Sequence, residues 1–163
     1  PEPRHYFSDG RVAGQDGVLV RVEPVAAERW IGIFAFGSFR SSAATRVLSM
    51  PNPDVFCVVA KGAGYLVSAA KPDVWEAVLV HPVIDVRAIA EAGLVIFTNF
   101  TELMAYGAQG VRWRTKRLAW DGLKIVSIGD RTLLGEYWDM RTEAVQQFEV
   151  ELATGASRGG VEP

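Results

Sequence analysis

The sequence predicts an all-β fold made of repeated four-stranded antiparallel units of about 38 residues. Three observations lead to this prediction: short apolar runs, turn-forming residues between the runs, and an internal repeat. The chain has 163 residues, of which 49% are hydrophobic and 22% are charged. This composition is typical of a globular protein, and the length is sufficient to bury a core. We therefore expect one β domain across residues 1–163.

Runs of β-branched, aromatic and aliphatic residues recur along the chain and predict strands, because such side chains fit a pleated surface. The stretch Val83–Glu91 also has helical spacing at Val83, Val86 and Ala90, but it is short and uncapped, so a strand ending in a turn fits it as well. We expect very little helix. The predicted strands are Gly17–Val22, Trp30–Phe36, Arg46–Met50, Val55–Ala60, Gly64–Ala69, Trp75–Val80, Val83–Ile89, Leu94–Thr98, Glu102–Tyr106, Val111–Thr115, Leu123–Ile128, Thr132–Trp138 and Val145–Leu152.

Turn-forming residues lie in the gaps between these strands. Glycine, proline, asparagine and aspartate favour turns because they adopt or stabilise the required backbone angles. The clearest signals are Asp16-Gly17, Pro51-Asn52-Pro53-Asp54, Ala92-Gly93, Asp121-Gly122, Gly129-Asp130 and Thr154-Gly155.

An internal repeat supports the four-stranded unit. When the segment Phe56–Trp75 is moved forward by 38 positions, Phe56 falls on Leu94 and Trp75 falls on Trp113. A shift of 39 continues the match into the following strands. A period near 40 with about four short strands is typical of a β-propeller blade. The repeat predicts an irregular N-terminal unit of about residues 1–53 and repeat units of about 54–92, 93–130 and 131–160.

The order strand, hairpin, strand, Gly-x-x-Trp occurs across Leu94–Asn99, Glu102–Tyr106 and Gly110–Trp113. This order resembles the blades of quinoprotein-like and WD-type β-propellers, and the resemblance covers about residues 54–160. It implies a partial or small β-propeller. The chain departs from the pattern, because it has no Trp-Asp in register at a blade end and supplies only about four units. An antiparallel β-sandwich or barrel therefore stays an alternative.

Charge and hydropathy exclude several classes of partner. The formal net charge of −2 gives no general attraction to nucleic acid or to an anionic membrane. No apolar run approaches the roughly 20 residues that a membrane-spanning helix needs. The first residue is Pro rather than Met, which indicates a processed chain from which a signal peptide could already have been removed. We expect a cytoplasmic location by default.

The sequence predicts no metal, cofactor or catalytic residue. Its single cysteine, Cys57, excludes an internal disulfide, and His5 and His81 are 76 positions apart. The segment Lys61–Gly64 contains Gly-x-Gly but lacks the third glycine and the following helix of a dinucleotide site.

One pair of carboxylates has a spacing that catalysis could use. Glu149 and Glu151 alternate with apolar residues, so both lie on one face of a strand, about 6–7 Å apart. Paired glycosidase carboxylates have a comparable separation. An ordinary solvated strand face explains the pattern equally well, and we favour that interpretation.

A basic and aromatic strand is the strongest local feature. Arg112, Arg114 and Lys116 share one face, and Trp113 and Trp120 lie among them. This pattern could bind a small ligand or nucleic acid. The same side chains could instead form ion pairs across the sheet, and the net acidity of the chain favours this second interpretation. The expected acidic partners are Glu136, Glu149 and Glu151.

A second candidate is aromatic. Trp120, Tyr137 and Trp138 each border a predicted turn, and aromatic side chains at a rim are typical of ligand and partner sites. Together with Arg112, Arg114 and Lys116 they are the candidate binding residues.

These observations predict a non-enzymatic binding or interaction module on a β-repeat scaffold. The alternatives are a hydrolase or lyase that uses carboxylates, and a small-ligand or nucleic-acid binder that uses residues 111–120. The predicted strands Trp30–Phe36 and Thr132–Trp138 carry few charges and no proline, so an exposed edge could pair with another chain. We therefore also expect a homodimer.

Overall fold

The computed structural model describes residues 2–8, 16–37 and 43–161. About 53% of these residues form strands and none forms an α-helix, so the all-β prediction is confirmed. Within the described part, the stretch with helical spacing forms the strand Asp85–Ile89 and then a single 3₁₀ turn, Ala90–Ala92. None of these residues belongs to a helix that could cross a membrane.

Each predicted strand has a counterpart in the structure, and two short strands at the ends of the chain were not predicted. These two are β1 and β15. The bounds are β1 Arg4–Tyr6, β2 Gly17–Val22, β3 Trp30–Ala35, β4 Arg46–Ser49, β5 Val55–Ala60, β6 Ala63–Ser68, β7 Trp75–Ala77, β8 Asp85–Ile89, β9 Leu94–Thr98, β10 Leu103–Gly107, β11 Gly110–Arg114, β12 Lys124–Ile128, β13 Thr132–Asp139, β14 Ala144–Glu151 and β15 Ser157–Gly159.

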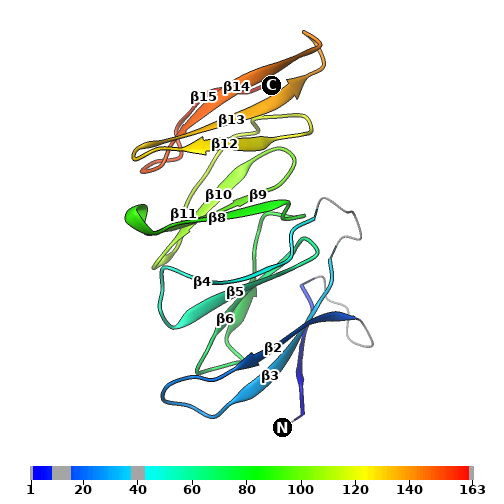
Figure 1. The fold of residues 1–163 in the computed structure, drawn as a ribbon, viewed down its shortest axis with the longest axis vertical. Helices are drawn as coiled ribbons and strands as arrows, with labels where there is room; N and C mark the ends of the chain where they lie inside the picture. The colour runs from blue at the N-terminus through cyan, green and yellow to red at the C-terminus, as the bar shows by residue number, and fades with distance from the viewer. Residues whose placement is uncertain (1, 9–15, 38–42, 162–163) are drawn as a thin grey trace. The chain divides into compact units, whose positions relative to one another are not determined.

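The described strands form four sheets and no closed barrel (Figure 1). The first sheet has the order β1–β3–β2, in which β1 is parallel and β2 antiparallel to β3. The other three sheets, β4–β7, β8–β11 and β12–β15, each place four strands side by side in chain order. Each of these three sheets therefore begins one strand before the unit that the sequence repeat delimits.

The repeat is visible in the strand positions and in the pairing. The first strands of the three four-stranded sheets begin at Arg46, Asp85 and Lys124, which are 39 residues apart. Trp75 on β7 pairs with Val67, and Trp113 on β11 pairs with Ala105. Both tryptophans therefore occupy the same register position of a fourth strand, as the shift of 38 predicts.

The hairpin before this position has changed its register between the two sheets. The β5–β6 turn has two residues between the paired Ala60 and Ala63, whereas the β9–β10 loop has four between Thr98 and Leu103. The pairing has thus slid by two residues relative to the repeat. Because side chains alternate with a period of two, an even slip leaves every side chain on its original face.

The chain divides into two compact units, Pro1–Asp85 and Val86–Pro163, and each has a core between its two sheets. In the first unit, aromatic and aliphatic residues of the first sheet pack on β5 and β6. In the second unit, sheet β8–β11 packs on sheet β12–β15. The first core includes Tyr6, Trp30, Phe34, Val58, Tyr65 and Val67, and the second includes Ile96, Leu103, Trp113, Leu133, Tyr137, Phe148 and Val150.

A tryptophan joins the two sheets of each unit by the same kind of contact. The Trp30 indole N–H donates to the Ala69 carbonyl at 2.8 Å, and the Trp113 indole N–H donates to the Leu152 carbonyl at 2.7 Å. In both cases the acceptor lies 39 residues further along, just after the third strand of the next sheet. A buried indole N–H needs such an acceptor, so the contact fixes how the sheets pack.

Candidate functional site

A cavity of about 350 Å³ lies in the second unit beside Trp120; we call it the Trp120 pocket. The segment after β11 supplies Trp120, the β13–β14 hairpin supplies most of the polar wall, and the segment after β15 closes the remaining side. The lining residues are Trp120, Tyr137, Asp139, Arg141, Thr142, Gln146, Gly160 and Val161.

The polar wall of the Trp120 pocket is held by its own hydrogen bonds. The Asp139 carboxylate accepts from the backbone N–H of Arg141 at 2.9 Å and from the Thr142 hydroxyl at 3.0 Å. The Gln146 amide in turn donates to the Thr142 hydroxyl at 3.2 Å. An aspartate at the start of a turn commonly bonds in this way. The network keeps three polar side chains in place before any ligand arrives.

The aromatic wall combines an accessible and a buried ring. The Trp120 side chain is 39% exposed, and the Arg117 guanidinium lies 5.1 Å from its ring centroid, within cation–π range. Tyr137 is almost fully buried. Burial raises the pKa of the Tyr137 phenol, and the negative charge of Asp139 raises it further. The phenol therefore keeps its proton at neutral pH.

The structure separates the three aromatic residues that the sequence grouped. Trp120 and Tyr137 both line the Trp120 pocket, but Trp138 does not. Neighbouring side chains on a strand point to opposite faces, so Trp138 lies on the other face of β13, paired with Val145. This outcome follows from alternation alone.

The basic strand is partly neutralised by a carboxylate. Arg112 and Arg114 lie on the exposed face of β11, and Lys116 lies just beyond its end. Arg114 donates twice to the carboxylate of Glu102, with both distances 2.6 Å. This bidentate bond lowers the pKa of Glu102 and raises that of Arg114. The sequence predicted ion pairing here, but with the acidic residues of later strands.

Arg112 lies beside two shallow depressions of balanced charge. One, of about 640 Å³, follows the β10–β11 hairpin, and the other, of about 270 Å³, also contains Asp130, Arg131 and Glu151. Two arginines and two carboxylates give this second depression no strong preference for an anion or a cation.

The two carboxylates of β14 lie at the surface, each beside a polar residue. The Glu151 carboxylate accepts from the Thr154 hydroxyl at 2.5 Å, and Glu149 lies opposite Arg158 on β15. In the described residues no group of three or more His, Cys, Asp or Glu side chains could hold a metal ion.

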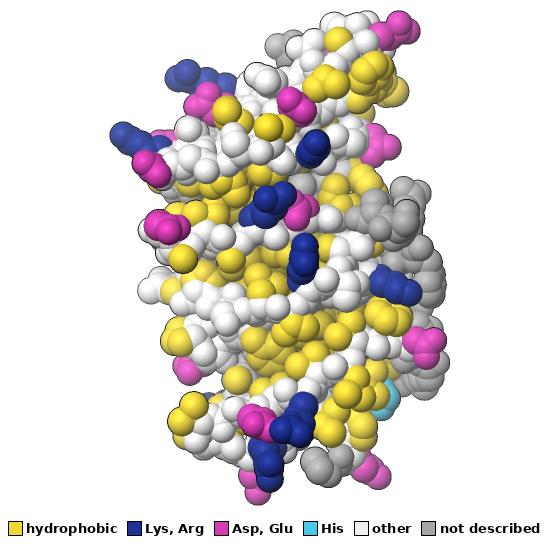
Figure 2. Space-filling view, in the orientation of Figure 1, with side chains coloured by type: hydrophobic (Ala, Val, Ile, Leu, Met, Phe, Trp, Pro, Cys, Tyr) yellow, Lys and Arg dark blue, Asp and Glu magenta, His cyan; other side chains and the backbone are white. Residues whose placement is uncertain are grey.

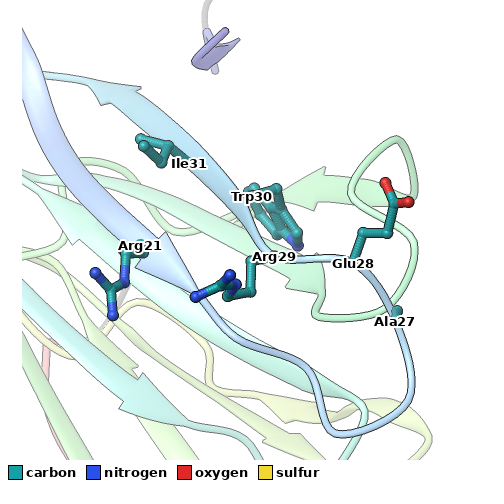
Figure 3. A pocket seen from close by; sticks show the side chains of 6 residues that line it. All are labelled: Arg21, Ala27, Glu28, Arg29, Trp30 and Ile31. Atoms are coloured by element: carbon teal, nitrogen blue, oxygen red, sulfur yellow. The ribbon is translucent and has the colours of Figure 1, made fainter. Parts of the chain in front are cut away.

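A further depression of about 640 Å³ lies at the β2–β3 hairpin of the first unit; we call it the hairpin depression. Arg21 and Arg29 extend to the same side of the hairpin, whereas the Glu28 carboxylate points away (Figure 3). Sequence analysis did not identify this site. The available signal was the alternation of Leu19 and Arg21 with apolar core residues on β2, which places both on the face turned away from the core.

Comparison with known proteins gives no match: no family model, no curated protein and no solved structure is similar to this chain. The geometry of the described residues is therefore the basis for the proposals below.

Proposed function

We propose that this chain is a binding module and that the Trp120 pocket is its ligand site. The observation that carries the proposal is a cavity with one accessible aromatic wall and one wall of polar groups already fixed by hydrogen bonds. Small-molecule sites are typically cavities of about 300–1,000 Å³ with a few well-placed polar groups, and this pocket falls at the lower end of that range.

The chemistry of the two walls favours a neutral, hydroxyl-rich ligand such as a small saccharide. The C–H bonds on one face of a sugar ring are weakly positive and pack on the electron-rich face of an indole, here that of Trp120. The sugar hydroxyls would then meet acceptors and donors of Asp139, Arg141 and Gln146. The pocket holds one carboxylate and one guanidinium, so it favours neither a strong anion nor a strong cation.

A nucleic-acid role for the basic strand is a weaker candidate. One of its three cations, Arg114, is already bound to Glu102. The remaining positive charge is small for phosphate binding, which draws its affinity from several unpaired cations.

The proposal is tested by screening the chain against an array of neutral saccharides and measuring the best binder by calorimetry. Trp120→Ala should weaken binding about tenfold or more, because aromatic stacking contributes roughly 1–3 kcal/mol. Gln146→Ala should weaken it less. Trp138→Ala, on the other face of the same hairpin, is the matched control and should bind as the unmodified chain does. If no neutral saccharide binds saturably, or if Trp120→Ala binds normally, the proposal is wrong.

A further inference from the structure

Each unit covers one face of its sheets and leaves another face of a terminal sheet exposed. On the last sheet, Leu133, Tyr137 and Phe148 point into the core, so the residues between them form the outer face. Leu134, Trp138 and Val145 on this face are 46%, 49% and 58% exposed. Figure 2 shows hydrophobic side chains gathered over the β13–β14 hairpin. A large apolar face of this kind usually marks an interaction surface.

The first sheet has a comparable outer face. Trp30 and Phe34 of β3 point into the core of the first unit, so Ile31 and Ile33 point away from it. Leu19 of β2, which pairs with Ile33, is 64% exposed. The hairpin depression opens at the end of this face.

The charges on the two outer faces are opposite. On the first sheet, Arg21 and Arg29 outnumber Glu23, which forms an ion pair with Arg21. This leaves one net positive charge. The outer face of the last sheet carries one net negative charge from three carboxylates and two cations, namely Glu136, Glu149, Glu151, Lys124 and Arg158. Contact between two identical faces would oppose like net charges, whereas contact between the two different faces would pair opposite ones.

We propose that the outer face of the last sheet binds the outer face of the first sheet on a second copy of this chain. Within each unit a sheet already packs on the next one through apolar side chains, and the proposed contact repeats this arrangement between copies. Trp138 is the aromatic anchor of the contact. It packs at the hairpin depression, where the guanidinium groups of Arg21 and Arg29 can lie over its ring. The inference is independent of the Trp120 pocket, because Trp138 does not line that pocket.

The first test is the mass of the chain in solution from about 1 to about 100 µM, a range that detects micromolar affinity. We expect the average mass to rise with concentration above the 17.8 kDa of a single chain. Trp138→Glu and Leu19→Lys should each prevent this rise. Val47→Lys, at an exposed position of β4 that belongs to neither face, is the matched control and should associate normally. A single-chain mass at every concentration overturns the proposal, as does loss of association in the Val47→Lys control.

The second test mixes two variants that cannot self-associate. Trp138→Glu keeps an intact first-sheet face and Leu19→Lys keeps an intact last-sheet face, so their mixture should form a one-to-one complex with twice the chain mass. Circular dichroism of each variant checks that it is folded. If both variants are folded and their mixture stays at the mass of a single chain, contact between the two different faces is wrong.

Discussion

At the scale of the residue, the contact between Glu102 and Arg114 shows how one side chain supports a whole loop. The Glu102 carboxylate receives two hydrogen bonds from Arg114 on β11, and the Asn99 side chain accepts from the backbone N–H groups of Thr101 and Glu102 at 2.8 Å each. These contacts hold the four-residue loop that carries the two-residue register change. The loop therefore relies on polar side chains as well as on strand pairing.

Replacing Glu102 by glutamine should destabilise the fold by about 1 kcal/mol or less at neutral pH, because Arg114 is half exposed and solvent screens the pair. The folded-state pKa of Glu102 is lowered, so the ionised carboxylate stabilises the fold above the ordinary glutamate pKa of about 4. This stabilisation is lost as the pH falls through the lowered value. Urea denaturation at several pH values measures the difference between the two proteins. Glu76→Gln, on the exposed face of β7, is the control; an E102Q effect independent of pH would contradict the assignment.

Gly135 is required by a ring that packs directly on its Cα. A Cβ at this position would lie 2.0 Å from the Cζ of Phe148, the buried residue opposite it on β14. Gly135→Ala should therefore cost about 1–3 kcal/mol or more of unfolding free energy. Adding Phe148→Leu should cost less in the Gly135→Ala background than in the unmodified chain. Gly129→Ala, whose Cβ meets only the Thr132 carbonyl at 3.5 Å, should be tolerated.

At the scale of the element, the sequence predicted most strands because alternating and continuous apolar runs mark them directly. It missed β1 and β15, which have three residues each and no apolar run. β1 is stabilised by parallel pairing with β3 and by the Tyr6 hydroxyl, which donates to the Pro72 carbonyl at 2.9 Å. Contacts between residues 66 positions apart leave no periodic signal in a sequence.

The two tryptophans that share a register position should contribute differently to stability. Trp113 is buried and its indole N–H bonds to Leu152, whereas Trp75 is 37% exposed. Trp113→Phe leaves a buried carbonyl without its donor and should cost about 1–3 kcal/mol. Trp75→Phe should cost less than about 1 kcal/mol, since substitutions at partly exposed positions usually do. Denaturation followed by far-ultraviolet circular dichroism compares them; equal losses would show that register position rather than burial sets the contribution.

The Trp120 pocket was predictable only in part. Trp120 and Tyr137 were identified because aromatic residues near turns are conspicuous. Asp139, Thr142 and Gln146 were not identified, because their arrangement depends on how the β13–β14 hairpin closes. The spacing of Asp139 and Thr142 is compatible with such a turn, but the sequence does not show that the turn faces an aromatic wall.

At the scale of the whole molecule, burial differs strongly from strand to strand. In β5, β6, β9 and β10 nearly all side chains are buried on both faces, whereas β13 and β14 alternate between buried and exposed residues. The overall charge and composition, which were read correctly as those of an all-β protein, give no information on this ranking. It depends on which sheets lie against one another.

Amide hydrogen exchange should follow this ranking. Amides of β5, β6, β9 and β10 should exchange most slowly, because opening them exposes the largest apolar area. Amides of β1 and β15 should exchange fastest among the strands, since each is short and lies at a sheet edge. Exchange followed by mass spectrometry at peptide resolution measures both groups. Protection of β15 equal to that of β10 would contradict the expectation.

The even spacing of β4, β8 and β12 sets the steps by which this chain can change in length. A segment of 39 residues beginning at Asp85 contains one complete sheet and its connection to the next. Tandem duplication or in-frame loss of such a segment would add or remove a sheet and leave the connections between the others unchanged. An insertion of one residue inside a strand would instead turn each later side chain of that strand to the opposite face. Mutations that copy or delete whole modules are therefore the ones that this architecture tolerates best.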